Sequence, residues 1–224
     1  MNKNGISMAV IKRLPKYHRY LTELLNNDLD RISSKDLSEK IGFTASQIRQ
    51  DLNCFGDFGQ QGYGYNVKEL LNQINIILGL TKEYRTIIIG AGNIGQAVAN
   101  YVKFEKLGFN LQAIFDINPK IIGIKIRDIE IRDIDFLDEF LKENHIDIGI
   151  ICVPRTNAQK VCDVLVNNGV SGIWNFAPTD LIVPEEVIIE NVHLSDSLLT
   201  LSCLMSWKIP SDGNFFHNMV NNRL

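Results

Sequence analysis

Three glycines near the middle of the chain have the spacing of a phosphate-binding loop, Gly90-Ala-Gly92-Asn-Ile-Gly95. The apolar run before them predicts a strand over 86–89, and the segment after them predicts a helix over 95–102. In that context Gly90 permits a tight turn, Gly92 lets a pyrophosphate approach the backbone, and Gly95 lets the helix pack on the strand. The pattern indicates a dinucleotide site, with contacts expected from Gly90, Ala91, Gly92, Asn93, Ile94 and Gly95.

An acidic residue follows the glycine loop at the distance that such a site requires. The second predicted strand, over 111–115, leads to Asp116, which lies 21 residues after Gly95. A carboxylate at this position binds the ribose hydroxyls of a dinucleotide. Because the same charge repels a 2′-phosphate, we expect the cofactor to be NAD(H) rather than NADP(H).

Two later segments end predicted strands and carry small, apolar and amide side chains. The strand predicted over 147–151 leads into Cys152-Val-Pro, and the strand in SGIWNF leads into Ala177-Pro178. Ligands of open α/β sheets bind beyond the carboxyl ends of the strands, so both segments should line the nicotinamide side. The contacts expected there are from Val153, Pro154, Asn175, Phe176, Ala177 and Pro178.

The elements that position this site form the second part of the chain. From Thr86 onward, short β-branched runs alternate with helical segments, which is typical of a parallel α/β sheet. Before about Leu80, apolar residues recur every three or four positions, which is typical of helices. The predicted fold is therefore α/β, with a winged helix-turn-helix domain, a Rossmann-type domain and a C-terminal helix. The expected bounds are 1–82, 83–195 and 196–224.

The first part of the chain has the signals of a helix-turn-helix. Pro15 is expected in the first turn of a helix that runs to about Asn27. Ser34 and Thr44 are the expected caps of two short helices that are joined by a turn at 41–43. The face buried between these helices should comprise Leu37, Ile41, Ile48 and Leu52. The outward face, which would read DNA, should comprise Ser46, Gln47, Arg49 and Gln50.

A glycine-rich segment after these helices resembles a wing. Four glycines alternate with aromatic residues over 55–65, which suits a hairpin whose tip approaches a phosphate backbone or a minor groove. The DNA contacts expected from its tip are Gln60, Gln61, Gly62 and Tyr63. Residues 1–50 carry nine Lys and Arg against five Asp and Glu, whereas residues 85–224 carry twelve against seventeen. This asymmetry favours DNA binding by the N-terminal part.

Composition excludes several other classes of protein. No apolar run approaches the ~18 residues of a membrane helix, and the N-terminus has no signal-peptide core, so we expect a cytoplasmic protein without a membrane partner. The four cysteines, Cys54, Cys152, Cys162 and Cys203, form no CxxC pair. We therefore expect neither a metal site nor a disulfide framework.

Taken together, these motifs resemble the Rex family of bacterial redox-sensing repressors over nearly the whole chain. The resemblance rests on Ser34-x-x-x-Leu-Ser38, Ile48-Arg-x-Asp51, Phe55-Gly, Gly62-Tyr-Gly-Tyr65, Gly90-x-Gly-x-x-Gly95, Val153-Pro154 and Asn175-Phe-Ala-Pro178. It implies a homodimer with an exchanged C-terminal helix, which binds a near-palindromic operator and is released by NADH. The family often has basic residues where Gln50 and Gln60-Gln61 stand, and their absence should weaken phosphate contacts or shift the operator preference.

The resemblance also implies a switch between two dimer arrangements. In the family, a tyrosine after the glycine loop, an arginine in the first helix and an acid before the exchanged helix form alternative pairs. The first two correspond to Tyr101, expected on the helix after the loop, and Arg19. The acid is Asp196 under one alignment, whereas His193 takes its place under another.

Two other functions are compatible with parts of this pattern. A small NAD-dependent dehydrogenase needs a substrate domain, but only about 45 residues follow Pro178, predicted as a strand over 187–194 and a helix over 197–207. The histidines, His18, His145, His193 and His217, are expected to lie away from the strand ends, so we expect no enzyme. A thiol- or peroxide-responsive repressor is the second alternative, because Cys152 lies beside the expected nicotinamide pocket.

Overall fold

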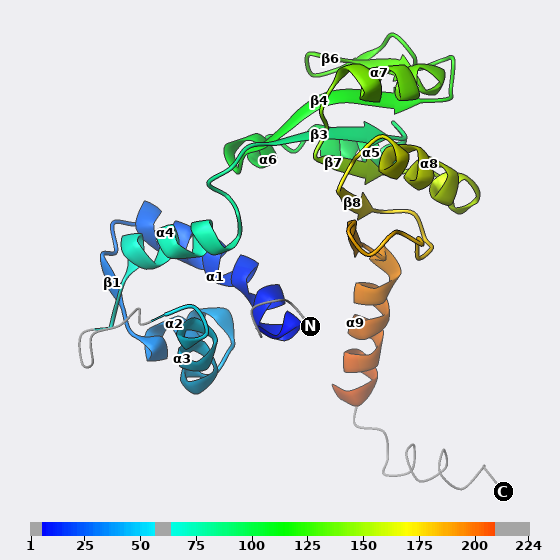
Figure 1. The fold of residues 1–224 in the computed structure, drawn as a ribbon. Coiled ribbons are helices and arrows are strands. Elements are labelled where there is room, and N and C mark those ends of the chain that lie inside the picture. The colour runs from blue at the N-terminus through cyan, green and yellow to red at the C-terminus, as the bar shows by residue number, and fades with distance from the viewer. Residues whose placement is uncertain (1–5, 57–63, 209–224) are drawn as a thin grey trace, which may run out of the picture. The chain divides into compact units, whose positions relative to one another are not determined.

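The computed structural model describes residues 6–56 and 64–208, and the chain divides into two compact units (Figure 1). The units are Met1–Glu83 and Tyr84–Leu224, so the division lies one residue beyond the boundary expected after residue 82. The C-terminal helix belongs to the second unit in this division, and a separate dimerisation segment over 196–224 stays a prediction. None of the described helices is both long and apolar enough to cross a bilayer.

In the described residues of the first unit, four helices surround a small antiparallel sheet. Its elements are α1 (Met8–Asn26), β1 (Arg31–Ile32), α2 (Ser34–Ile41), α3 (Ala45–Asn53), β2 (Tyr65–Asn66) and α4 (Val67–Ile77). Strand β1 pairs with β2, and this pairing brings the two ends of the α2–α3 region together. All four helices contribute leucine or isoleucine side chains to one buried core, which holds the unit together by apolar burial.

Side-chain caps determine where these helices begin. Ser7 caps α1, so Pro15 lies inside α1, and its expected place in the first turn is wrong. A proline inside a helix removes one backbone hydrogen bond, and here the buried face of α1 outweighs that loss. Ser33, rather than Ser34, caps α2, whereas Thr44 caps α3 as predicted.

The turn between α2 and α3 has the geometry of a helix-turn-helix. Gly42 ends α2 in the left-handed conformation, with φ of 72°, which glycine adopts without the steric cost of a Cβ. The four side chains predicted to be buried between the helices are each 1% exposed or less, namely Leu37, Ile41, Ile48 and Leu52. The helix pair and its core are therefore confirmed.

A buried carboxylate joins α1 to α3. Asp51 of α3 is 1% exposed, and it accepts two hydrogen bonds from Arg13 of α1, from Nε to Oδ2 at 2.6 Å and from Nη2 to Oδ1 at 2.7 Å. The Tyr17 hydroxyl donates to Oδ2 at 2.8 Å, and Gln47 Nε2 donates to Oδ1 at 3.1 Å. Because the guanidinium and the carboxylate meet as two planar forks, they fix both the distance and the rotation of α3 against α1.

The same contacts set the protonation states of the cluster. Burial by itself would raise the pKa of Asp51, but hydrogen bonds from Arg13, Tyr17 and Gln47 outweigh it and hold that pKa below its ordinary value. Burial, followed by the hydrogen bond to Asp51, raises the pKa of Tyr17, which therefore stays a hydrogen-bond donor. The carboxylate is thus charged and fully paired at neutral pH.

The second unit is built on one sheet in the order β5-β6-β4-β3-β7-β8-β9. Its strands are β3 (Tyr84–Ile89), β4 (Phe109–Asp116), β5 (Lys125–Ile126), β6 (Ile129–Asp133), β7 (Ile148–Ile151), β8 (Gly172–Asn175) and β9 (Ile188–Asn191). Every neighbouring pair is parallel except β5 with β6, which form an antiparallel hairpin at one edge. The predicted parallel α/β sheet is confirmed.

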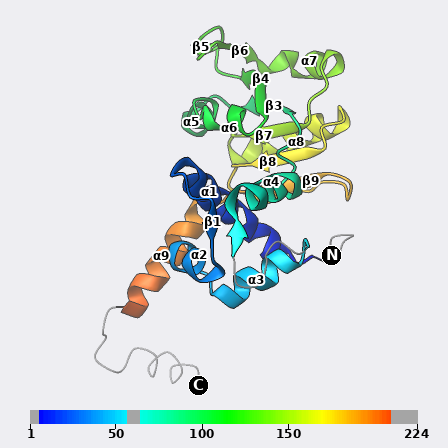
Figure 2. The same ribbon diagram turned by 90° about the vertical axis from the view of Figure 1, so that its left-hand side faces the viewer.

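Helices lie on both faces of this sheet (Figure 2). They are α5 (Asn93–Ala99), α6 (Lys103–Lys106), the short 3-10 turn η1 (Ile134–Phe136), α7 (Leu137–Glu143) and α8 (Arg155–Asn167). Ile87 and Ile89 of β3 point into the core with α7 and α8, whereas Ile88 points to the other face, into the core with α5. This alternation is the period of two that a central strand requires.

The helix after the glycine loop is shorter than expected. We predicted 95–102, but α5 begins at Asn93 and ends at Ala99, so Tyr101 lies between α5 and α6 rather than on a helix. Asn100 is the C-cap of α5, and both its backbone N–H and its Nδ2 donate to the Gln96 carbonyl oxygen, at 3.0 and 2.9 Å.

The last described helix, α9 (Leu194–Lys208), follows β9 after two residues and begins three residues earlier than predicted. From Leu194 to Ser206 every side chain of α9 is exposed. The exposed large apolar side chains are Leu194, Leu198, Leu199, Leu201, Leu204 and Met205. A helix with so many exposed apolar groups is typical of one that packs against another surface.

The Asp51 cluster gives a prediction of stability and its pH dependence. We expect Asp51→Asn to lower the free energy of unfolding by about 2–4 kcal/mol at pH 7, because an amide must turn one donor toward Arg13 or Tyr17. The pKa of Asp51 is lower in the folded chain than the ordinary value of about 3.9 in the unfolded chain. The carboxylate of Asp51 therefore contributes its full stabilisation above about pH 5. This stabilisation is lost as the pH falls below about 3.9 toward the folded pKa.

Urea unfolding of the full chain at pH 7 and at pH 3 measures both effects. The difference between wild type and Asp51→Asn should shrink at the lower pH. Asp28→Asn is the control, because Asp28 is exposed on the same unit. If Asp51→Asn changed stability at pH 7 by no more than this control, the cluster would not stabilise the unit.

Candidate dinucleotide site and DNA-facing helix

The glycine loop connects β3 to α5 and has open backbone at its tip. Gly90 has φ of +98°, and a Cβ there would lie 2.6 Å from the Cys152 carbonyl oxygen. A Cβ on Gly95 would lie 1.9 Å from the Gly90 carbonyl oxygen. A Cβ on Gly92 would meet nothing within 4 Å, although Gly92 is the N-cap of α5 and makes no side-chain cap. Gly90 and Gly95 thus close the loop, while Gly92 leaves space for a ligand at the helix N-terminus.

Asp116 lies beside this loop at the carboxyl end of β4. Its Oδ2 accepts a hydrogen bond from the Ala91 backbone N–H at 2.6 Å, and its Oδ1 accepts one from the Asn118 N–H at 2.8 Å. These bonds hold the carboxylate next to the glycine loop. Each carboxylate oxygen can accept a further hydrogen bond, so Asp116 retains the capacity to bind ribose hydroxyls.

The two segments expected on the nicotinamide side lie at neighbouring strand ends. Backbone bonds from Cys152 N to Ile89 O at 2.8 Å and from Phe176 N to Ile151 O at 2.9 Å extend the β3-β7-β8 ladder into them. Val153 reaches Gly90, because its Cγ1 would lie 3.1 Å from a Cβ on that glycine. Pro154 and Pro178 are exposed beyond the strand ends. The structure therefore brings the glycine loop and both segments to one edge of the sheet.

Asn175 and Ala177 differ from the other residues expected there, because they are buried. Asn175 is fully buried, and its amide bonds to the loop after β8 and to Asn191 of β9. Ala177 is 1% exposed. In this structure, Asn175 shapes the loop from beneath, whereas Phe176 is half-buried at its surface.

The side chain of Cys152 is half-buried and packs against apolar neighbours. Burial raises the pKa of its thiol to about 12. A redox-reactive cysteine needs a favoured thiolate and some exposure. The environment of Cys152 therefore does not suit a peroxide sensor.

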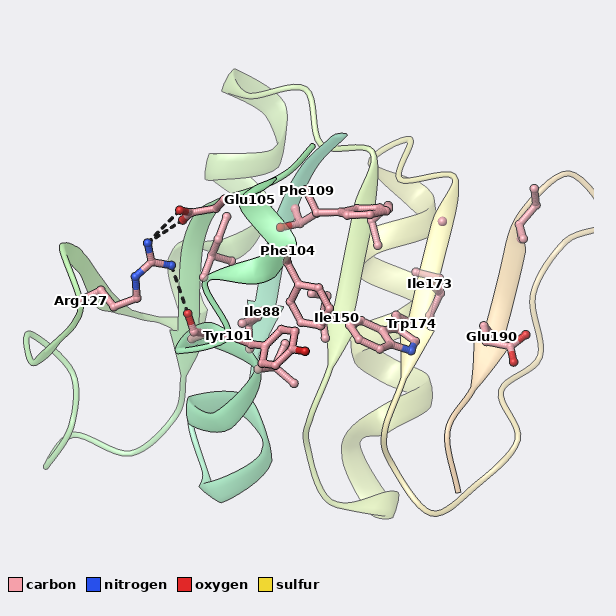
Figure 3. A pocket seen from close by; sticks show the side chains of 17 residues that line it. Ile88, Tyr101, Phe104, Glu105, Phe109, Arg127, Ile150, Ile173, Trp174 and Glu190 are labelled. Carbon is pink, nitrogen blue, oxygen red and sulfur yellow. Dashed lines mark hydrogen bonds and ion pairs between the residues drawn. The ribbon is translucent and has the colours of Figure 1, made fainter. Parts of the chain in front are cut away.

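An apolar groove of about 340 Å³ lies on the sheet face that carries α5 and α6, away from the carboxyl-terminal edge (Figure 3). Rings line it in sequence, with centroids 4.6 Å apart for Tyr101 and Phe104 and 5.5 Å apart for Phe104 and Trp174. Trp174 in turn contacts Phe176 of the loop after β8, at 4.7 Å. The sequence did not predict this chain of rings. The periodicity of a strand shows which face Trp174 occupies, but not which residues of other elements pack against it.

An ion pair closes one end of the groove. Arg127 bonds to Glu105, with 2.8 Å between Nη2 and Oε1, and donates from Nη1 to the Ala99 carbonyl oxygen at 3.4 Å. Figure 3 shows Arg127 reaching across to the end of α5 beside Tyr101. Arg127 thereby caps the helix that begins at the glycine loop.

The outward residues of α3 are placed largely as expected. Ser46, Arg49 and Gln50 are exposed, whereas Gln47 is half-buried and bonds to Asp51. Arg49 Nη1 donates to Ser34 Oγ at 3.0 Å, so its guanidinium rests near the start of α2. The wing residues Gln60, Gln61, Gly62 and Tyr63 lie outside the described residues.

The residues expected to form a switch lie on different elements. Arg19 is exposed on α1 beside the Tyr20 ring, and Tyr101 is 48% exposed at the groove. Asp196 is exposed in the first turn of α9. His193 Nε2 lies 3.2 Å from Asp180 Oδ1, two residues beyond the carboxyl end of β9. The expectation that all four histidines lie away from the strand ends is therefore wrong for His193, while His217 lies outside the described residues. Within the described chain, no group of three or more His, Cys, Asp or Glu is placed to hold a metal ion.

Two family models match the chain. One, described as a CoA binding domain, matches residues 81–179, and the other, described as a putative DNA-binding protein N-terminus, matches residues 5–53. The chain is 78% identical to the redox-sensing transcriptional repressor Rex of Clostridium kluyveri, over 91% of this chain and 97% of the relative. It is 75% identical to that of Clostridium acetobutylicum, over 91% and 95%.

Solved structures match the chain as well. A crystal structure of RSP with β-NAD+ and operator DNA has a TM-score of 0.88 and 60% identity, and the match covers 98% of this chain and 99% of that one. RSP with β-NADH has a TM-score of 0.84 and 61% identity, covering 91% and 96%. RSP is itself described as a Rex-family repressor.

The glycine loop allows folding and ligand binding to be separated. We expect Gly92→Ala to leave the melting temperature unchanged or slightly higher, because its Cβ enters open space, and to weaken NADH binding at least about tenfold. Gly95→Ala should lower both the melting temperature and the affinity for NADH, because its Cβ would overlap the backbone of Gly90. Differential scanning fluorimetry and NADH fluorescence titration measure the two effects. Wild-type NADH affinity in Gly92→Ala would place the pyrophosphate elsewhere.

Proposed function

This chain belongs to the Rex family of redox-sensing transcriptional repressors, and we propose that it binds operator DNA as a homodimer and is released from it by NADH. One observation carries this proposal. A relative that is 60% identical over 98% of this chain has been solved with β-NAD+ and operator DNA together. The likeness therefore includes the candidate dinucleotide site and the helix-turn-helix.

The cofactor that best suits the site is NAD(H). The open space at Gly92 and the anchored carboxylate of Asp116 support a pyrophosphate and an unphosphorylated ribose, respectively. The family model that matches residues 81–179 is described as a CoA binding domain. The structure of a 61% identical relative with β-NADH favours NADH over CoA as the ligand of this chain. The bound group would supply the redox signal through its nicotinamide ring, and the chain's residues would hold it and respond to it.

Operator binding is assigned to the exposed face of α3. Arg49 has the charge and reach for a base edge or a phosphate, and Ser46 and Gln50 flank it on the exposed surface. A neutral Gln50 supplies no ion pair to DNA, so this face should make fewer phosphate contacts than one with a basic residue there. We propose that residues 60–63, at the tip of the wing, add further DNA contacts, on the basis of the glycine-rich sequence of that segment.

A second copy of the chain suits the apolar surfaces of the second unit. From Leu194 to Ser206 the side chains of α9 are exposed, and the groove beside Trp174 is lined by apolar and aromatic groups. Exchange of α9 between two protomers would bury its six large apolar side chains. A dimer also presents two copies of α3 to a near-palindromic operator.

The alternatives have less support. The raised pKa of Cys152 opposes a thiol-responsive repressor. For an enzyme, the close relatives are named as repressors, and we infer that the chain catalyses no reaction on its cofactor. His193 is the one described histidine near the carboxyl ends of the strands, and it is paired with Asp180. A bacterial repressor acts in the cytoplasm, where the DNA lies.

We assign the redox switch to Tyr101, Arg19 and either Asp196 or His193. The hydroxyl of Tyr101 is without a hydrogen-bond partner among the described residues, and its ring begins the aromatic chain that leads to Phe176. Tyr101 is thus placed to respond to the nicotinamide side and to offer a hydroxyl to another group. Linkage requires that DNA weaken NADH binding by the same factor by which NADH weakens DNA binding.

A titration at fixed NAD+ tests the function. We expect the full chain to bind a duplex selected from a random pool in the presence of NAD+, and to leave it as NADH rises. NADPH at the same concentrations should have little effect, because Asp116 opposes a 2′-phosphate. Sedimentation should give two chains per duplex.

Arg49→Ala is the variant that separates DNA binding from cofactor binding. Its affinity for the selected duplex should fall by about 1–3 kcal/mol, while its NADH affinity stays that of wild type. Equal DNA affinity in both proteins would remove α3 from the interface. Release of wild type by NADPH as readily as by NADH would contradict the role of Asp116.

Tyr101→Phe tests the switch. The variant keeps the ring that packs against Phe104 and loses only the hydroxyl. We expect wild-type NADH affinity but a shifted NADH:NAD+ ratio at half-release from DNA, measured by gel-shift titration. Asp196→Ala and His193→Ala, compared in the same assay, decide which of the two fills the third position. Unchanged midpoints in all three variants would remove these residues from the mechanism.

A further inference from the structure

A pair of amide side chains, one buried and one half-buried, joins the loop after β8 to the segment that leads into α9. Asn175 is the last residue of β8, and it is one of three polar residues that are fully buried in the described chain, with Asp51 and Thr86. Its partner in register on β9 is Asn191, the last residue of that strand. The pair therefore lies where the expected nicotinamide pocket borders the segment that leads into α9.

Both hydrogens of the Asn175 amide have strong acceptors. Nδ2 donates to the Thr179 carbonyl oxygen at 2.7 Å and to Asn191 Oδ1 at 2.8 Å. Oδ1 of Asn175 accepts from the Ala177 N–H at 3.0 Å. One planar group therefore bonds to the 176–179 loop on one side and to β9 on the other, so it cannot turn toward either without straining the other.

Asn191 lies at the base of α9. The backbone N–H of Val192 donates to the Asn175 carbonyl oxygen at 2.8 Å, and α9 begins at Leu194. The described side chains of α9 are exposed, so in this protomer its direction is set by the residues just before it. If the 176–179 loop moves, the hydrogen bond between Asn175 and Asn191 moves the end of β9 with it. Because α9 begins three residues after Asn191, this movement would change the direction of α9.

We propose that Asn191 is a positioning residue that transmits the state of the dinucleotide site to α9, through its hydrogen bond from Asn175. The proposal rests on the proposed function, because it assumes that NADH changes the loop after β8 and that α9 takes part in the dimer. It assigns to Asn191 no contact with the cofactor or with DNA. Its side chain is needed only as an acceptor at Oδ1.

Two substitutions of similar size test this acceptor. Asn191→Leu removes it, and Asn191→Asp keeps an oxygen in its place. The readout is the coupling ratio, the dissociation constant of the selected DNA duplex with NADH divided by that with NAD+. We expect Asn191→Leu to lower this ratio by about 2- to 30-fold, the usual range for single residues in a coupled network, while NADH affinity changes little. Asn191→Asp should keep the wild-type ratio.

A matched control separates coupling from general loosening. Asn144 is half-buried in the same unit, and its Nδ2 donates to the Phe140 carbonyl oxygen at 2.9 Å, within its own turn. Asn144→Leu should lower the melting temperature without changing the ratio. Hydrogen exchange gives a readout without DNA: NADH should change the exchange of α9 amides in wild type and Asn191→Asp, and not in Asn191→Leu.

The possible failures are distinguishable. A wild-type ratio of 1 would overturn the proposed function and this inference together. A wild-type ratio above 1 that Asn191→Leu leaves unchanged would overturn the inference alone, as would an equal fall of the ratio in Asn191→Asp.

Discussion

The placement of α3, the second helix of the helix-turn-helix, depends on one buried charge, the carboxylate of Asp51. An unpaired charge in a protein interior costs several kcal/mol, so α3 is stable only where Arg13 and Tyr17 meet that carboxylate. A buried ion pair adds little net stability over apolar packing, but it tolerates few other geometries. It therefore acts chiefly as a constraint on orientation. Because Arg13 lies on α1, α1 and α3 must move as one body. Arg19 lies on α1 as well, two turns or so beyond Arg13, on the helix that Asp51 holds against α3.

The second unit obeys a different constraint, the close approach of backbones at one edge of the sheet. Gly90 and Gly95 remove the Cβ atoms that would separate β3, α5 and the segment after β7. Asp116 and Asn175 then hold the neighbouring loops through backbone N–H groups and carbonyl oxygens. The site is thus framed by main-chain contacts, which leave little freedom for its walls. Side chains with more freedom, such as Tyr101 and Phe104, lie on the open sheet face.

Local patterns predicted much of this fold, and the failures have physical causes. The glycine triplet, Asp116, Thr44 and the buried face of the helix pair all follow from short-range rules, and the structure has them as predicted. Asp51 was noticed only within a motif, since its partner Arg13 is 38 residues away and no periodicity links them. Pro15 was misplaced because tertiary packing of α1 overrode its preference for a first turn. Asn175 was expected at the surface of the site because sequence does not show which way an amide faces. The β5–β6 hairpin was not anticipated either, since its strands are too short to show a period.

The half-buried thiol of Cys152 has a consequence for its reactivity toward oxidants. Burial raises the pKa of this thiol to about 12, so far less of it is ionised at neutral pH than of an ordinary cysteine. Attack on hydrogen peroxide proceeds through the thiolate, so burial slows oxidation of this cysteine. The sulfur beside the glycine loop is therefore protected from oxidants by its surroundings, whereas the thiols of Cys54 and Cys203 are exposed. Any oxidation of this protein would begin at those two side chains, away from the dinucleotide loop.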